Sequence, residues 1–278
     1  MDTVLSHLVD APLSAEEFVL ALQAQAAQSR AVNHPLLLAL AQREFSRPDE
    51  ALKDFFSQYF FYSYRFTQYL CAVISRLESP QHRAVLAGNL AEETGHVDPE
   101  HEAALRGVGI DPELVRHPHP VLFRRFLEAI GLNVPHLLSQ APDVATVAWV
   151  ETFQDLCRSP EQSQGVGALG IATEAVVRFM YAHLLTAIHH AWPQLSLRDR
   201  VFFDLHAAVD DDHAEVLRGI AVSLAQSPSG RMGLAVGMLR ALDARANFFD
   251  HMLNRLRQHD TAAPAVGLDG LGKDRKHG

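Results

Sequence analysis

The sequence predicts an all-α helical bundle. Two observations predict this class: Pro and Ser residues that favour helix N-termini recur along the chain, and no segment alternates apolar and polar residues as a half-buried strand would. The chain has 278 residues and 48% of them are hydrophobic, so it can bury a large core as one domain. We expect that domain over residues 1–259, followed by a disordered tail over residues 260–278.

The expected helices follow one another along the chain. Ser14 and Glu17 have the spacing of a capping box, which opens a helix to about residue 30. Asp98 and Pro99 place a cap before a proline at the first helical position, and that helix runs to about residue 107. By the same signals we expect further helices over about residues 35–45, 48–77, 79–95, 120–130, 142–158, 159–190 and 228–259, and one that begins near residue 196.

Composition disfavours several classes of function. The formal net charge is −9, which argues against general binding to nucleic acid. No apolar run approaches the 18 residues of a membrane-spanning helix, and the N-terminal segment lacks the basic and apolar regions of a secretory signal. Cys71 and Cys157 are expected to be buried free thiols. We therefore expect a cytoplasmic protein without membrane or nucleic-acid partners, and a homodimer is compatible with these features.

One segment, FFDLHAAVDDDHAEVLRGI, carries the most specific chemistry. His206, Asp210 and His213 are four and three residues apart, and no Pro or Gly interrupts the segment before its penultimate residue. On one helix this spacing puts the three side chains on a narrow stripe, whereas Asp211 and Asp212 fall on other faces. Two imidazoles and one carboxylate on one face make half of a transition-metal site. The alternative is a solvated helix that is rich in Asp and His.

The other half of such a site has to come from facing helices, and two segments offer it. The first is NLAEETGHVDPEH, in which Glu92 and Glu93 end one helix and His101 begins the next. The second is GALGIATEAVVRFMY, in which Glu174 is the single acid of a long apolar stretch. A lone carboxylate on a buried helix is costly unless it is paired or metal-bound. Its ordinary partner would be Arg178, one helical turn further on.

Taken in order, these motifs resemble one known family. NLAEETG with HEAALRGVGID, then GALGIATEAV, then FFDLHAAVDDDHAEVL, resemble the heme-oxygenase-like diiron oxidases. These are iron-containing redox enzymes related to the TenA and PqqC proteins, with which they share a fold of about seven core helices. The resemblance runs from about His34 to about Leu256. The family pattern is a Glu, a following His, a Glu on a later helix and a final His-x3-Asp-x2-His, and each element is present here in that order.

The resemblance implies six metal ligands. Glu93 would be the first carboxylate, because it precedes Thr94 and Gly95 as the family Glu precedes its Gly. The spacing from this Glu to the following His is short here, so His96 is a rival to His101, and Glu92 is a rival to Glu93. The full implied set is Glu93, His101, Glu174, His206, Asp210 and His213.

The resemblance also implies the chemistry. Three carboxylates and three imidazoles suit two Fe(II) ions, the second of which is held loosely, better than a thiolate-preferring metal; manganese and zinc also fit the ligand types. Such a centre would activate O2 as a co-substrate, with Glu93, Glu174 and Asp210 as the catalytic carboxylates. The substrate would be a small organic molecule, because family members N-oxygenate or cleave amino acids, or decarboxylate fatty acids.

The sequence gives less information about the substrate than about the metal ligands. Arg65 and Arg178 could each pair with a substrate carboxylate or with an acid of the protein. One branch of the family consumes its own Tyr and Lys to build an aromatic amine, and the absence of lysine between Lys53 and Lys273 disfavours that branch. The helix over 48–77 carries an aromatic stripe that is expected to pack in the core, with a pocket lining as the alternative: Phe55, Tyr59, Tyr62 and Phe66.

Two other classes of function remain. A cofactorless enzyme of the TenA or PqqC type would not need six metal ligands, so the complete set disfavours it. A non-catalytic helical binding protein would use the acids and histidines as a closed structural metal site. Metal analysis and O2 consumption separate these readings from the oxidase.

Overall fold

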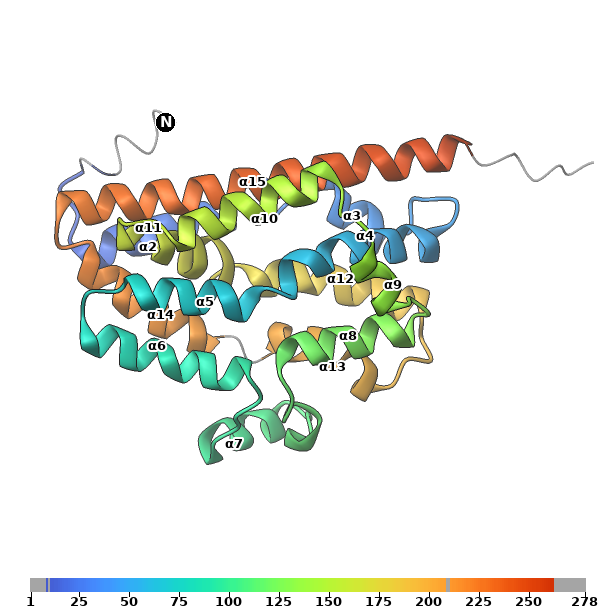
Figure 1. The fold of residues 1–278 in the computed structure, drawn as a ribbon, viewed down its shortest axis with the longest axis horizontal. Helices are drawn as coiled ribbons and strands as arrows, with labels where there is room; N and C mark the ends of the chain where they lie inside the picture. Colours follow the sequence, from blue (N-terminus) through green and yellow to red (C-terminus); the bar gives the residue numbers. More distant parts are fainter. Residues whose placement is uncertain (1–8, 10, 209–210, 263–278) are drawn as a thin grey trace, which may run out of the picture.

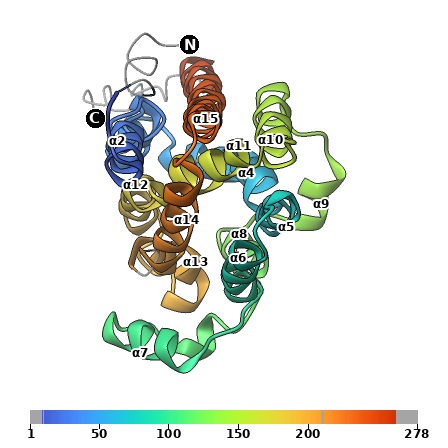
Figure 2. The ribbon, with the colours of Figure 1, turned by 90° about the vertical axis from the view of Figure 1, so that its left-hand side faces the viewer.

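The computed structural model describes residue 9, residues 11–208 and residues 211–262, and within these ranges it contains helices and no strands. Figure 1 shows the long helix α15 (Pro228–Ala262) along one side of the bundle, with α10 (Val144–Cys157) beside it. On the opposite side α7 (Pro99–Gly107) projects from the body, and Figure 2 shows it apart from the other helices in the end-on view as well. The predicted all-α class is confirmed.

The other helices fill the bundle between these two sides. A 3-10 turn, η1 (Pro112–Leu114), follows α7, and a π-helix, η2 (Gly167–Glu174), lies in the middle of the chain. The α-helices are α2 (Ala15–Ala27), α3 (Pro35–Ala41), α4 (Pro48–Ser63), α5 (Phe66–Arg76), α6 (Pro80–Glu93), α8 (His119–Ala129), α9 (Val134–Ser139), α11 (Gln162–Val166), α12 (Val177–Ala191), α13 (Leu197–Ala208) and α14 (Asp211–Leu224).

The predicted helix starts are capped as the sequence indicates. The Ser14 hydroxyl accepts from the Glu17 backbone N–H at 3.2 Å, and the Glu17 carboxylate accepts from the Ser14 N–H at 2.8 Å. The Asp98 carboxylate accepts from the backbone N–H of His101 at 2.8 Å. Each cap satisfies an N–H that the first helical turn leaves without a partner, which fixes where the helix begins.

Two predicted helices are interrupted in the structure. The helix expected over 48–77 ends at Ser63 and starts again at Phe66. Both parts pack against α10, but α4 also packs against α8, whereas α5 packs against α6, so the two parts take different directions. No Pro or Gly marks this break, so local sequence could not reveal it. The segment expected over 159–190 contains the π-helix, where the Ala175 N–H donates to Gly170 O, five residues back, at 2.9 Å.

The helix expected to carry His206, Asp210 and His213 is described as α13 and α14, with residues 209–210 between them. The prediction of one continuous helix, and Asp210 itself, therefore lie outside the described residues. At the C-terminus α15 continues to Ala262, beyond the expected boundary at 259, and most of the predicted tail, 263–278, also lies outside the described residues.

The core contains a run of stacked aromatic rings. Tyr62 of α4 stacks on Trp149 of α10 with ring centroids 4.0 Å apart, and Trp149 stacks on Phe248 of α15 at 4.6 Å. Cys157 is buried as expected, but Cys71 is exposed, because it lies on the outer face of α5. The stacked rings of Tyr62, Trp149 and Phe248 join α4, α10 and α15, which are distant in sequence.

One helical stretch passes the length and composition test for a membrane span, although none was expected. It covers Gln162–Ala191, which comprises α11, η2 and α12, and 61% of its most apolar window is buried inside the fold. A central helix of a helical bundle needs apolar residues on most of its faces, so burial accounts for this composition.

Candidate metal centre

Two buried carboxylates face each other across the interior of the bundle. Glu93 is the last residue of α6 and is 1% exposed, and Glu174 is the last residue of the π-helix and is 6% exposed. Irregular π turns inside a helix are found mostly at functional sites, because the extra residue redirects a side chain. Two carboxylates this deep in an apolar interior require compensating partners.

Three buried histidines supply those partners. His206 belongs to α13, His213 to α14 and His119 is the first residue of α8. His119 Nδ1 lies 2.9 Å from one Glu93 oxygen, and His213 Nδ1 lies 3.9 Å from the other. His119 Nδ1 makes no hydrogen bond of acceptable geometry within the described residues, as expected of a ring nitrogen that binds a metal.

The five side chains form two overlapping groups, each able to hold a metal ion. Glu93, His119 and His206 make one group, and Glu93, Glu174 and His213 make the other. Within each group the ligand atoms lie within 4.8 Å of one another. Glu93 belongs to both groups, so the two groups share one carboxylate.

Gly95 brings His119 to Glu93. The glycine follows the end of α6 with φ of +93°, a conformation that side chains other than glycine rarely adopt. A Cβ at Gly95 would lie 2.7 Å from the backbone of His117, so the absence of a side chain lets the chain before α8 pass directly against the end of α6. The first residue of α8 then meets the last residue of α6.

Hydrogen bonds fix the orientation of two imidazoles. His206 Nδ1 lies 2.6 Å from the carbonyl oxygen of Phe202, to which it donates, so its Nε2 is left without a proton and free to bind a metal. His213 Nε2 donates to Glu92 at 3.1 Å, which leaves Nδ1 toward Glu93. A histidine whose second nitrogen donates to a carboxylate or carbonyl is the usual arrangement in metal sites.

Burial and charge shift the pKa values of the cluster. Burial raises the pKa of Glu93, but the charges of His119, His206 and His213 and the close contact with His119 outweigh it and lower that pKa to about 2. Burial raises the pKa of Glu174 to about 7, with a further increase from Glu93 that His213 opposes. Burial also lowers the pKa of His206 to about 4. The neutral imidazole of His206 is the form that binds a divalent metal.

His101 lies outside both groups. Its Nδ1 is 3.1 Å from the carboxylate of Glu92, the same oxygen that accepts from His213. Burial raises the pKa of Glu92, but hydrogen bonds from His101 and His213 lower it to about 2. His101 therefore contacts the residue that orients His213, and its predicted role as a ligand stays a prediction.

Of the other five predicted ligands, the structure brings four together. Glu93, Glu174, His206 and His213 are brought together by the structure, whereas Asp210 lies outside the described residues. His119 was not among the predicted ligands, because Pro120 served only to predict the start of the helix over 120–130. The run HPHP at residues 117–120 was the available signal, since a histidine between two prolines has a fixed place at a helix start.

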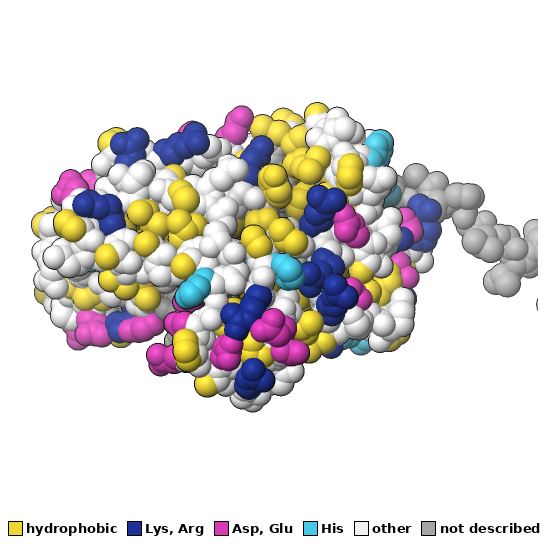
Figure 3. All heavy atoms as spheres, turned by 60° about the horizontal axis from the view of Figure 1, so that its bottom comes forward, with side chains coloured by type: hydrophobic (Ala, Val, Ile, Leu, Met, Phe, Trp, Pro, Cys, Tyr) yellow, Lys and Arg dark blue, Asp and Glu magenta, His cyan; other side chains and the backbone are white. Residues whose placement is uncertain are grey.

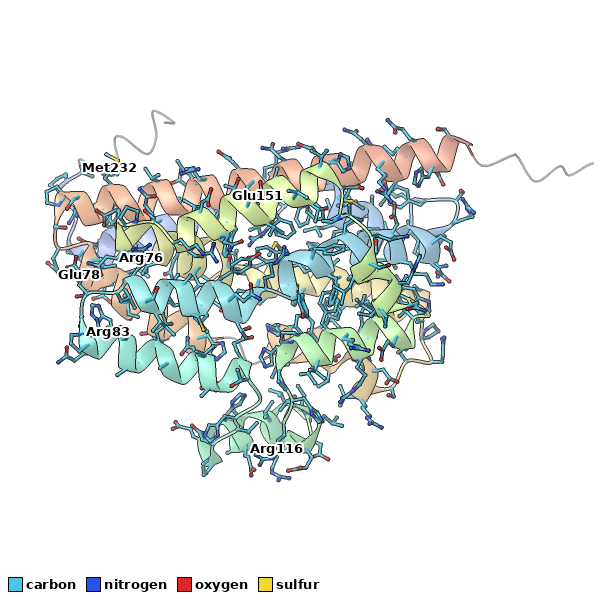
Figure 4. The ribbon with its side chains drawn as sticks, in the orientation of Figure 1. Arg76, Glu78, Arg83, Arg116, Glu151 and Met232 are labelled. Atoms are coloured by element: carbon cyan, nitrogen blue, oxygen red, sulfur yellow. The ribbon has the colours of Figure 1, made fainter. Side chains whose placement is uncertain are left out.

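The segment that carries His101 is held by charged contacts. Arg116 donates to Glu113 at 2.7 Å and to the carbonyl of Val97 at 3.3 Å, and it also pairs with Glu102 of α7 (Figure 4). Figure 3 shows acidic and basic side chains together over this projecting part of the molecule. The segment is thus tied to the loop that leads into α8.

The metal-ligand groups border an interior cavity. Its polar lining includes Glu93, His119, Glu174 and His206. Tyr59, Tyr62 and Phe66 also line it, so the aromatic stripe of α4 both packs in the core and forms a cavity wall. Arg65 and Arg178, the two arginines considered for a substrate, are not part of this lining, whereas Arg245 of α15 is.

An all-helical bundle with buried carboxylate and histidine groups beside a cavity defines a metal-dependent helical enzyme. Residues 53–246, well over half of the chain, match the model of a family described as iron-containing redox enzyme. The chain belongs to this family, and it is an iron-dependent oxidoreductase.

Two relatives of similar sequence agree with this assignment. A 4-aminobenzoate synthase of Nitrosomonas europaea is 26% identical over 237 residues, which cover 84% of this chain and 91% of the relative. A 4-aminobenzoate synthase of Chlamydia muridarum is 24% identical, covering 72% of this chain and 76% of the relative.

Two solved structures share the fold. A CADD-like protein of unknown function from Nostoc punctiforme superposes with a TM-score of 0.65 at 17% identity, covering 92% of this chain and 99% of that one. A TenA homolog from Pseudomonas syringae pv. tomato gives 0.64 at 13% identity, covering 86% and 92%. The predicted resemblance and the heme-oxygenase-like fold are confirmed.

Proposed function

We propose that the chain is a diiron oxidase that uses O2 to oxidise a small organic substrate bound in the cavity. The observation that carries the proposal is the position of Glu93, which belongs to both three-residue groups and borders the cavity. One carboxylate shared by two groups is the arrangement needed for two adjacent ions. A single structural metal would need only one of the groups.

In this proposal Glu93, His119 and His206 hold one iron, and Glu93, Glu174 and His213 hold the other. Asp210, predicted from the sequence, would be the sixth ligand. Iron in such a site supplies the electrons that O2 requires. The residues of the chain hold the ligand geometry: Phe202 O fixes the tautomer of His206, and Glu92 fixes that of His213.

The substrate is proposed to be an external molecule. Two relatives are named 4-aminobenzoate synthase, so formation of an aromatic amine is one reaction to consider. The cavity has tyrosines in its wall, Tyr59, Tyr62 and Tyr181, but its lining contains no lysine. Of the three lysines of the chain, Lys53 is the one within the described residues, and it pairs with Glu50 on α4. An amine nitrogen, if the reaction uses one, would therefore come from a bound molecule.

The test is iron loading under anaerobic conditions followed by exposure to O2 with a panel of amino acids and fatty acids. Wild-type chain should bind up to two Fe(II) and consume O2 faster than free Fe(II) does. Glu174→Gln should bind at most one Fe(II) and lose the accelerated O2 consumption, because the second iron loses its own carboxylate.

The matched control is Glu151→Gln, since Glu151 lies on the exposed face of α10 (Figure 4). It should bind iron and consume O2 as the wild type does. Iron binding without any accelerated O2 consumption across the panel would replace the oxidase with a structural metal site.

A further inference from the structure

Arg245 is a fully buried cation in the cavity wall. It lies on α15, is 1% exposed and is one of the largest buried side chains of the protein. Its position in the sequence, within an apolar stripe of a core-facing helix, would ordinarily hold an aliphatic residue. A guanidinium cannot lose its proton to escape burial, so it stays charged at this depth.

The hydrogen bonds of Arg245 use only part of its capacity. Nη1 donates to the carbonyl oxygen of Ala172 at 2.7 Å and reaches the sulfur of Met180 at 3.9 Å. Nη2 donates to the hydroxyl of Thr173 at 3.0 Å, and Nε has no acceptor within the described residues. Since a guanidinium has five N–H donors, a planar acceptor with two oxygens can still be accommodated.

The partners that Arg245 does have are neutral. No carboxylate among the described residues forms an ion pair with it. Its charge acts instead on two tyrosines of the cavity: it lowers the pKa values of Tyr59 and Tyr62, which burial nevertheless raises above their usual value, so both phenols stay protonated.

A structural role alone does not account for a charge at this position. Ala172 and Thr173 belong to the π-helix that ends in Glu174, so Arg245 does support the segment that places a metal ligand. Both contacts go to neutral acceptors, which do not require a charged donor, and an unpaired charge in an apolar interior is a costly arrangement. The observation that calls for an anion is the combination of charge, burial and an unused donor.

We propose that Arg245 binds the carboxylate of the substrate, and that the substrate is a small monocarboxylate with an apolar body. The apolar part would contact the other walls of the cavity, which include Phe66, Val177, Met180 and Phe202. Because Arg245 contacts Thr173, the neighbour of Glu174, a carboxylate held there places the rest of the molecule beside the metal ligands. This assignment rests on the proposed oxidase function.

Calorimetry on the full-length Fe(II)-loaded protein without O2 tests the assignment through binding alone. The probes are two pairs that differ only in charge: octanoate with octanamide, and phenylacetate with phenylacetamide. In the wild type at least one carboxylate should bind roughly tenfold tighter than its amide. Arg245→Gln should remove that preference and leave the amide affinity within roughly threefold, because Gln keeps a donor for Ala172 or Thr173.

Arg240→Gln on the exposed face of the same helix is the matched control and should bind as the wild type does. If the wild type has no preference for either carboxylate, or if Arg245→Gln keeps the preference because iron is the anchor, the assignment is overturned. If Arg245→Gln does not fold, Arg245→Lys decides: it should keep a weaker preference, since a point charge replaces a planar fork, and an unchanged octanoate affinity would overturn the assignment.

Iron content and O2 consumption of the same preparations separate the two proposals. Wild-type protein that binds iron and consumes O2 without preferring carboxylates would remove the role of Arg245 alone. Protein that prefers carboxylates through Arg245 but never consumes O2 faster than free Fe(II) would remove the oxidase and leave the binding site.

Discussion

The interior of this protein has two halves of opposite character. Between α4, α10 and α15, rings such as Tyr62, Trp149 and Phe248 stack on one another. Between α6, α8, the π-helix and the segment of α13 and α14, the buried groups are carboxylates and imidazoles such as Glu93 and His206. Both halves exclude water equally, so burial alone does not distinguish a stabilising region from a functional one.

What differs is the sign of the contribution to stability. Burying apolar rings is favourable, at about 25 cal/mol for each Å² removed from water. Burying carboxylates is unfavourable unless a cation compensates them, and the raised pKa of Glu174 records that cost. The metal half therefore departs from what folding alone would select, which is typical of functional sites.

The sharpest test of this contrast is Glu93→Gln. Because Glu93 belongs to both ligand groups, the variant should lose both irons. At micromolar Fe(II) it should bind less than about 0.2 Fe(II) per chain. The unfolding midpoint of the metal-free chain should also fall at neutral pH, because the lowered pKa of Glu93 means that folding stabilises its carboxylate. Metal analysis and thermal unfolding of the same samples check both statements.

A suitable control is Glu78→Gln, because Glu78 is an exposed acid before α6 (Figure 4) and should keep normal iron content. If Glu93→Gln still bound two irons, the assignment of Glu93 to both ligand groups would be wrong.

The opposite result is expected in the aromatic half. Trp149→Ala should lower the free energy of unfolding by about 3–5 kcal/mol, because Trp149 is 1% exposed and its removal leaves a large cavity between Tyr62 and Phe248. Iron bound per folded chain should stay close to the wild-type value. Denaturant unfolding measures the loss, and a change below about 1 kcal/mol would contradict the role assigned to this stack.

The two halves also differ in how far the sequence predicts them. Helix starts were predictable, because local capping by residues such as Ser14 and Asp98 decides them. The break between α4 and α5 was not, because packing against other helices decides it. Four of the predicted ligands, Glu93, Glu174, His206 and His213, come together as their motifs indicated.

The parts of the site that escaped prediction depend on tertiary structure. His119 enters through the loop after α7, and its distance to Glu93 depends on a backbone contact at Gly95 that no spacing rule describes. Arg245 was not predicted, because Arg65 and Arg178 were the two arginines considered as partners of a substrate carboxylate. Its helical neighbours Ala241 and Phe248 are buried, so an arginine at a core position was a readable signal.

A smaller effect separates His119 from His101. His119→Asn should lose one of the two irons, because it removes the imidazole 2.9 Å from Glu93. His101→Asn should keep both sites and bind iron about 10–100-fold more weakly, since it removes a contact to Glu92, which orients His213. Iron titrations of the two variants side by side check the order. If His101→Asn lost an iron and His119→Asn kept both, the ligand predicted from the sequence would replace the one proposed from the geometry.

The smallest expected effect isolates how the polar half is assembled. Gly95→Ala should weaken iron binding by roughly tenfold, because the new methyl group meets the His117 backbone and pushes α8, with His119, away from Glu93. Gly109→Ala is the matched control: its φ of +78° imposes a similar backbone strain, but nothing lies within 4 Å of the added Cβ. Both variants should lose stability in denaturant unfolding, Gly95→Ala the more because of its added contact with the His117 backbone, and only Gly95→Ala should lose iron affinity. Equal iron affinity in the two variants would show that the approach of α8 to α6 does not depend on Gly95, and that the polar half tolerates movement as readily as a surface loop.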